Sequence, residues 1–186
     1  PRPIPPPPAP PRDLPPIPRR GYQTPMPIPA REIFLADAEA TARLGERLAD
    51  ILRPGDLVLL KGPIGAGKSL LARAAILSLL AEEGRQEDVP SPTFTLVQSY
   101  DTGRGEVIHA DLYRLSDPRD LDDIGLTDAL GQAICLIEWP EMLDLSDGIP
   151  RLEIALMPEG EGRRAVLTAL GERWRDALDP LAGEAA

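Results

Sequence analysis

The sequence GPIGAGKS at residues 62–69 constrains the fold of this chain more than any other feature. It fits the pattern G-x-x-x-x-G-K-[ST], which is typical of loops that bind the phosphates of a nucleotide. Its glycines allow the loop to turn tightly and bring successive backbone N–H groups against phosphate oxygens. We expect the Lys68 amine to reach the β- and γ-phosphates and the Ser69 hydroxyl to bind Mg²⁺. The pattern therefore predicts a site for a nucleoside triphosphate and magnesium.

The segments on either side of this loop support that prediction. Residues 57–60 form a short apolar run, LVLL, which is typical of a strand buried in a parallel sheet. The mostly apolar run from Lys68 to Leu80 predicts a helix, whose N-terminal dipole would face the bound anion. A strand, a glycine-rich loop and a helix in this order are the context that a phosphate-binding loop needs.

The remaining segments predict an α/β fold. We expect further strands at residues 32–35, 91–100, 107–111, 134–137, 151–156 and 165–170, because these segments are apolar, β-branched or alternating. We expect further helices from an N-cap at Asp37 to about residue 52, from an N-cap at Asp117 to about residue 124, and around Trp174. The elements predict a P-loop NTPase-like fold, in which helices flank a mixed, mostly parallel sheet with a late antiparallel hairpin.

Composition divides the chain into three parts. Residues 1–30 are rich in proline, which removes backbone donors and favours polyproline II, so we expect an extension without helix or sheet. Residues 31–180 are expected to form the P-loop domain, and residues 181–186 a short tail.

Charge and cysteine content exclude several classes of protein. The net charge is −10, and residues 1–30 carry +3, so the rest of the chain carries −13. A domain this acidic is not expected to bind nucleic acid over a broad face. No apolar run reaches the length of a membrane span. A single cysteine, Cys135, rules out an internal disulfide and indicates a reducing compartment, so we expect a cytoplasmic protein with Cys135 as a small buried hydrophobe.

Two acids follow predicted strands and are candidates to hold the magnesium ion. Asp111 ends the run VIHA and Glu138 ends the run ICLI. Both are expected at the carboxyl end of a buried strand, and ligands of open α/β sheets bind beyond these strand ends. A nucleotide site of this kind needs such an acid to bind Mg²⁺ directly or through water. The residues alone do not indicate which of the two acids binds the metal.

Four other residues have both a functional and a structural interpretation. Thr93 lies between the loop and the two acids, where switch segments occur in such folds. Its hydroxyl would contact magnesium or the attacking water, or it would only cap a turn or form a hydrogen bond across a strand. Trp139 would stack on a base or a partner, or pack in the core. Arg163 and Arg164 would reach phosphate from the late hairpin, or lie in solvent.

Four segments in a fixed order make this chain resemble a known family. They are GAGKS at 65–69, SPTFTLV at 91–97, HADLYRL at 109–115 and ICLIEWP at 134–140. Together they are similar to the bacterial TsaE (YjeE) family, over roughly residues 31–170. That family is the ATPase partner in forming threonylcarbamoyladenosine at position 37 of tRNA. The resemblance implies slow, magnesium-dependent ATP hydrolysis and binding to a TsaB–TsaD complex, with tRNA contacted only through those partners.

The resemblance also assigns roles to individual residues. It implies that Ser69 and Glu138 bind Mg²⁺, which favours Glu138 over Asp111 as the metal ligand. Lys68, Asp111 and Thr93 are then catalytic or part of the switch. The residues implied to contact the nucleotide are Gly62, Ile64, Gly65, Ala66, Gly67, Lys68, Ser69, Glu141 and Arg163.

Two other functions remain open from the residues alone. A small-molecule kinase uses the same loop, metal and domain size, but it needs an acceptor pocket and usually an arginine-bearing lid, and no lid segment is evident. A nucleotide-dependent switch with little turnover is the other alternative.

Overall fold

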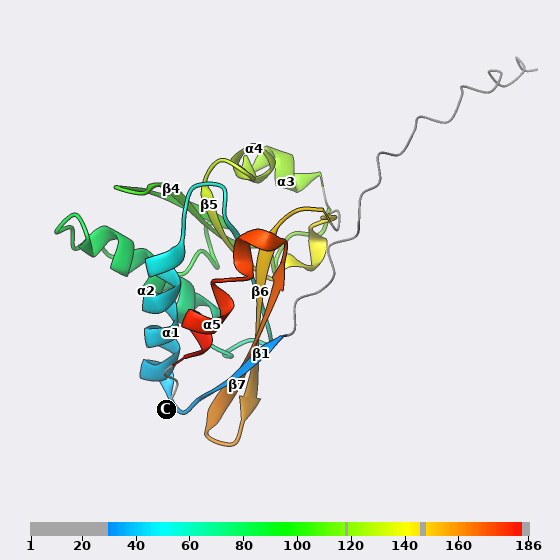
Figure 1. Cartoon of the computed structure of the whole chain (residues 1–186). Coiled ribbons are helices and arrows are strands. Elements are labelled where there is room, and N and C mark those ends of the chain that lie inside the picture. Colours follow the sequence, from blue (N-terminus) through cyan, green and yellow to red (C-terminus); the bar gives the residue numbers. More distant parts are fainter. Residues whose placement is uncertain (1–29, 118, 146–147, 184–186) are drawn as a thin grey trace, which may run out of the picture.

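The centre of the fold is strand β2 (Leu57–Lys61), which lies in the middle of a seven-stranded sheet of order β1-β7-β6-β2-β5-β4-β3 (Figure 1). The computed structural model describes residues 30–117, 119–145 and 148–183. Strand β2 pairs in parallel with β5 (Ile134–Glu138) and with β6 (Arg151–Glu159). Central parallel strands are buried on both faces, which explains why residues 57–60 are continuously apolar.

The outer strands complete a mixed sheet. They are β1 (Arg31–Leu35), β3 (Val97–Thr102), β4 (Gly105–Asp111) and β7 (Gly162–Leu170). Strands β7 and β3 run antiparallel to their neighbours, and the other five run in one direction. The predicted mixed, mostly parallel sheet and the late antiparallel hairpin, β6–β7, are therefore confirmed.

Alternate side chains of β2 point to opposite sides of the sheet, so its apolar residues make both faces apolar. Helices therefore cover both faces. Val58 and Leu60 belong to the larger core, with helices α1 (Ala38–Ile51), α2 (Lys68–Ala81) and α5 (Leu178–Ala182). Leu57 and Leu59 belong to a second core, under the short helices α3 (Asp120–Asp123) and α4 (Leu126–Ala129). Figure 1 shows these two helices apart from α1 and α2.

Most predicted elements are confirmed, but residues 91–96 are not a strand. They form consecutive turns, and β3 begins only at Val97. Pro92 cannot donate to a strand ladder, and its carbonyl accepts the Leu96 N–H at 2.8 Å, which closes a turn. Leu96 has a φ of 68°, outside the β region. The hairpin that follows is paired as predicted.

The helix predicted from Asp117 is shorter than expected. Helix α3 spans only Asp120–Asp123, with Arg119 as its N-cap, and Gly125 ends it in a left-handed conformation. Asp117 still accepts the Arg119 N–H, at 2.9 Å, in the preceding turn. Pro118, which was expected at the first helical position, lies outside the described residues.

The C-terminal end also differs from the prediction. Trp174 is fully buried in the short 3₁₀ helix η2 (Glu172–Trp174), and the α-helix comes later, as α5. Pro180 has no N–H and is tolerated only in the first turn of a helix, so the helix begins close to it. Helix α5 runs past residue 180 to Ala182, and Leu181 is buried. The tail that was predicted to begin at residue 181 therefore starts inside a packed helix.

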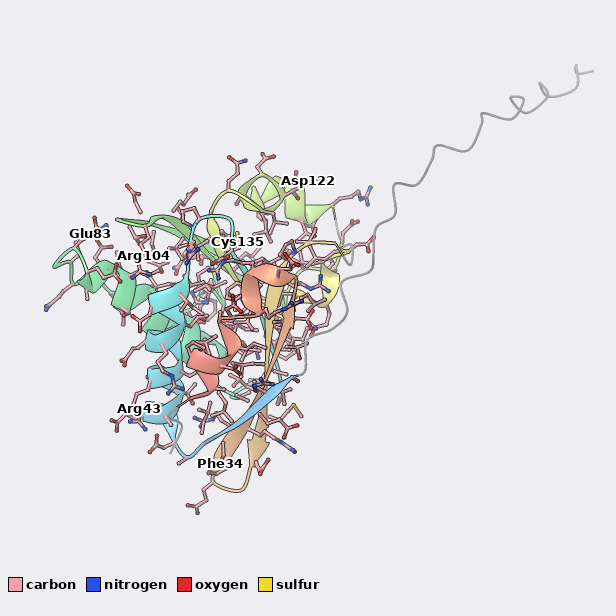
Figure 2. All side chains as sticks on the ribbon, in the orientation of Figure 1. Phe34, Arg43, Glu83, Arg104, Asp122 and Cys135 are labelled. Carbon is pink, nitrogen blue, oxygen red and sulfur yellow. The ribbon has the colours of Figure 1, made fainter. Side chains whose placement is uncertain are left out.

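The side chain of Arg104, labelled in Figure 2, joins the β3–β4 hairpin to helices α1 and α2. Arg104, in the turn between β3 and β4, donates to the carbonyls of Ala49 and Asp50 at the end of α1, at 2.7 and 3.1 Å. It also pairs with Glu82, which caps the end of α2. Cys135 is buried in the sheet, as expected for a small hydrophobe, and burial raises the pKa of its thiol to about 12.

The described part of the chain holds no helix with the length and apolar character needed to cross a membrane.

Gly45 sets the distance between α1 and α2. A Cβ on this residue would lie 2.3 Å from the Leu71 carbonyl oxygen and 2.9 Å from the Ala74 Cβ. The two helices therefore pack in direct backbone contact, which a larger residue would prevent.

We predict that Gly45→Ala lowers the free energy of unfolding by about 1–3 kcal/mol, because overpacking outweighs the better helix propensity of alanine. Urea denaturation measures this change. Glu46→Ala, at the exposed neighbouring position, is the control and should stay within about 0.5 kcal/mol of the unsubstituted chain. A Gly45→Ala protein as stable as this control would contradict the close packing.

Candidate functional site

The glycine-rich loop joins β2 to α2 at the carboxyl edge of the sheet. Gly62 has a φ of +131°, and a Cβ there would lie 2.2 Å from the Leu156 carbonyl oxygen of β6, so only glycine fits. The loop then exposes Ile64 and Gly65 and buries Ala66 against the larger core. Helix α2 begins immediately after Gly67, and its first-turn N–H groups and dipole favour an anion at this point.

Lys68 is the buried cation of the loop, with only 4 % of its surface exposed. Its Nζ donates to the carbonyl oxygens of Gly62 and Pro63, at 2.8 and 2.9 Å, and lies 3.9 Å from the centre of the Trp139 ring. Burial lowers the pKa of Lys68, and the charge of Glu138 opposes that shift. Phosphate oxygens at the loop would replace these neutral carbonyls with charged acceptors for the amine.

The two strand-end acids lie side by side at the same edge. Asp111 and Glu138 are paired residues of β4 and β5, and Glu138 is also opposite Leu60, at the end of β2. Both carboxylates are buried, at 5 % and 2 % exposed. This register results from three parallel strands that end level with each other, and both acids lie at strand ends, as the sequence predicted.

The two acids differ in what they contact. Glu138 Oε2 accepts a hydrogen bond from the Ser69 hydroxyl at 2.9 Å, which links the strand end to the first turn of α2. Asp111 Oδ1 instead accepts the backbone N–H of Tyr113 at 3.0 Å. Of the two acids, Glu138 is therefore the one in contact with the hydroxyl that the loop pattern assigns to magnesium.

The Ser69–Glu138 pair fits magnesium in its chemistry. Mg²⁺ prefers oxygen ligands, and it is usually held by one or two protein oxygens together with substrate phosphates and water. A hydroxyl and a carboxylate 2.9 Å apart beside the phosphate loop are such a donor set. Among the described residues there is no cluster of three or more His, Cys, Asp or Glu that could hold a metal without the phosphates.

Ser91 connects the turn segment 91–96 to the loop, a role that the sequence did not reveal. Its hydroxyl donates to Ser69 Oγ at 3.2 Å and lies 2.8 Å from Thr93 Oγ1. Thr93 itself is exposed, and it reaches Ser69 through Ser91. Only the SPT sequence, with two hydroxyl residues around a proline, could have indicated that Ser91 also faces the site.

Arg163 lies beside the phosphate loop. Arg163, on β7, donates to the Asp37 carbonyl and the Thr41 hydroxyl, at 2.7 and 2.6 Å. Its Cδ lies 3.8 Å from the position that a Cβ on Gly67 would occupy, so it borders the phosphate loop.

Glu141 is exposed in the 3₁₀ helix η1 (Pro140–Met142), where its charge acts on the Lys68 amine. Arg164 points away from the loop and pairs with Glu159 at 3.0 Å.

Trp139 and His109 complete the surroundings of the acids. The Trp139 ring stands between Lys68 and the Tyr113 ring, with ring centres 4.8 Å apart, instead of packing in the core. His109 is fully buried on β4, and its Nε2 lies 2.9 Å from Glu138 Oε1. No role for His109 follows from the sequence, because a histidine two residues before a strand-end acid has no recognised pattern.

Comparison with known proteins points to one family. The sequence model of the family described as threonylcarbamoyl adenosine biosynthesis protein TsaE matches residues 35–166. TsaE of Rickettsia felis is 36 % identical over 132 residues, which is 71 % of this chain and 75 % of that protein. TsaE of Bacillus subtilis is 32 % identical over 145 residues, which is 77 % of this chain and 88 % of that protein. The crystal structure of Bacillus subtilis YdiB resembles this fold with a TM-score of 0.66, at 26 % identity, over 84 % of this chain and 96 % of that one.

We predict that Lys68→Ala weakens ATP binding by about 2–5 kcal/mol, or roughly 30-fold or more, because the buried cation of the loop is lost. Titration calorimetry with ATP measures the affinity. Lys61→Ala is the matched control, because the Lys61 amine pairs with Glu153 at 2.6 Å and not with the loop. Equal ATP affinity in the two variants would remove Lys68 from the site.

Proposed function

Because this chain belongs to the TsaE family of threonylcarbamoyl adenosine biosynthesis proteins, we propose that it is a magnesium-dependent ATPase that serves tRNA threonylcarbamoyladenosine formation. The P-loop NTPase-like fold agrees with nucleotide hydrolysis. The observation that carries the proposal is the contact of Ser69 with Glu138 at the mouth of the phosphate loop. It joins the loop that binds phosphates to an acid that can hold their magnesium ion.

The residues of the loop bind and orient the triphosphate. The backbone N–H groups of residues 64–69, at the start of α2, face the phosphates, and the Lys68 amine exchanges the carbonyls of Gly62 and Pro63 for phosphate oxygens. Magnesium, when bound by Ser69 and Glu138, neutralises charge on the β- and γ-phosphates. We infer that Arg163, which lies beside Gly67, and Glu141, whose charge acts on the Lys68 amine, contact the rest of the nucleotide.

Asp111 and Thr93 are the proposed residues for the attacking water. Asp111 is buried next to Glu138 but is not bonded to Ser69, so it is free to accept a proton from water or to orient it. Thr93 lies on the turn segment 91–96, which contacts Ser69 through Ser91. A change at the metal would therefore move this segment, as in nucleotide-dependent switches.

The surface of the chain supports action on a protein complex. The chain outside residues 1–30 carries a charge of −13, which disfavours direct binding of tRNA. Around the site, Ile64, Phe94 and Tyr113 are 74 %, 88 % and 55 % exposed. Exposed apolar side chains of this size are typical of protein interaction sites. We propose that the partner is the TsaB–TsaD complex, that tRNA is reached only through it, and that the protein acts in the cytoplasm.

An ATPase assay with and without purified TsaB–TsaD tests this function. We expect slow hydrolysis by the chain alone and faster hydrolysis when the complex is added. ADP formation that depends on a small-molecule acceptor would instead support a kinase. Tight nucleotide binding without turnover, with or without the complex, would support a switch.

We predict that Glu138→Ala loses most of the gain in nucleotide affinity that Mg²⁺ gives, and weakens Mg²⁺-free binding far less. The reason is that Glu138 acts on the nucleotide through the metal. Titration of ATP in Mg²⁺ and in EDTA separates the two affinities. Asp111→Ala is the matched control, expected to keep the gain from Mg²⁺ but to lose hydrolysis. Equal losses in Mg²⁺ and EDTA for Glu138→Ala would remove Glu138 from the metal site.

A further inference from the structure

His109 is a buried polar residue beside the site, and the proposed function gives it no task. It is the single histidine of the chain and is fully buried on β4, two residues before Asp111. Its neighbours along the strand, Val107, Ile108 and Ala110, are buried apolar residues. Burying an imidazole costs more free energy than burying an aliphatic side chain unless hydrogen bonds compensate. An aliphatic residue would therefore suit this position better if packing were its purpose.

The surroundings of the two ring nitrogens of His109 indicate which of them carries the proton. Its Nε2 lies 2.9 Å from Glu138 Oε1, and its Nδ1 has no hydrogen-bond partner among the described residues. An ionised carboxylate only accepts hydrogen bonds, so the proton of this contact is on Nε2. A neutral imidazole with its proton on Nε2 leaves only a lone pair at Nδ1 unpaired. The one N–H donor of His109 is then used for the hydrogen bond to Glu138.

Glu138 is consequently held at both of its oxygens. Oε1 accepts from His109 on β4, and Oε2 accepts from Ser69 on α2, at 2.9 Å in each case. The donor from Ser69 is the same hydroxyl that the loop offers to magnesium, so that contact changes when the metal binds. The contact from His109 does not involve a metal-binding oxygen and can persist.

We propose that His109 is a positioning residue, which fixes the Glu138 carboxylate so that Oε2 stays directed at the magnesium position beside Ser69. The proposal rests on the proposed magnesium-nucleotide function. A carboxylate with one fixed oxygen cannot rotate away when Ser69 turns to the metal. Residues that orient a metal ligand in this way typically change metal affinity by 10–100-fold when they are removed.

The first test uses the unsubstituted protein without nucleotide. Because the chain has one histidine, ¹⁵N-histidine labelling gives a single imidazole in the NMR spectrum. We expect a proton on Nε2 that exchanges slowly with water, an unprotonated Nδ1, and a changed Nε2–H signal in Glu138→Gln. A proton on Nδ1 alone would overturn the proposal, since Nε2 could then not donate to Glu138.

The second test compares two substitutions that differ in whether a donor remains. His109→Gln keeps an amide N–H at about the distance of Nε2 from the backbone, and His109→Leu keeps the volume without a donor. ATP affinity in Mg²⁺ and in EDTA is measured by calorimetry, and thermal melting checks that both variants fold. We expect His109→Leu to lose about 10–100-fold of the affinity gain from Mg²⁺, with little change in EDTA, and His109→Gln to retain most of it.

A double substitution tests whether His109 acts through Glu138, which a purely structural role would not require. In a Glu138→Gln background, His109→Leu should have no further effect on the gain from Mg²⁺, because the two residues act as one unit. A full gain from Mg²⁺ in His109→Leu, or equal losses in His109→Leu and His109→Gln, would overturn the proposal. If the unsubstituted chain shows no gain from Mg²⁺, the proposed metal site itself is wrong, and the role of His109 falls with it.

Discussion

The hydrogen bond between Ser69 and Glu138 is the contact on which the site depends. It joins the first turn of α2 to the end of β5, and the same edge of the sheet also carries the phosphate loop and Asp111. It exists because β2, β5 and β4 are parallel and end level with each other. Tight packing of α1 on α2 at Gly45 then keeps the start of α2 in place relative to the sheet. The position of the proposed metal site is therefore a consequence of strand register and helix packing together.

The chemistry of this edge divides between groups that are buried and groups that are exposed. Lys68, Asp111, Glu138 and His109 are buried and held by hydrogen bonds, which suits residues that must keep one geometry during hydrolysis. Thr93 and Phe94 are exposed on turns, and the Thr93 hydroxyl is linked through Ser91 to Ser69, which contacts Glu138. A partner that binds the exposed residues would thus act on the metal site through one short chain of hydroxyl groups. Under the proposed function, this is the route by which a partner would speed up hydrolysis.

The sequence predicted the sheet, the loop and the two acids at strand ends, but only the family resemblance favoured Glu138 over Asp111 for the metal. Apolar runs and the glycine pattern depend on local residues, so β2, α2 and the late hairpin could be found from them. Threonine and phenylalanine favour a strand over residues 91–96, but Pro92 and the positive φ of Leu96 lead to turns there. Ser91 and His109 were missed because their contacts are with residues 22 and 29 positions away. Only the pairing of β4 with β5 brings His109 to Glu138.

A crystal structure of the chain with Mg²⁺ and a non-hydrolysable ATP analogue tests the central claim most directly. We predict a metal beside Ser69 Oγ, with Glu138 bound to it directly or through one water. The Lys68 amine is predicted to have left the carbonyls of Gly62 and Pro63 for the β- and γ-phosphates. A metal held by Asp111 and remote from Ser69, or a Lys68 amine still on those carbonyls while the analogue is bound, would contradict it.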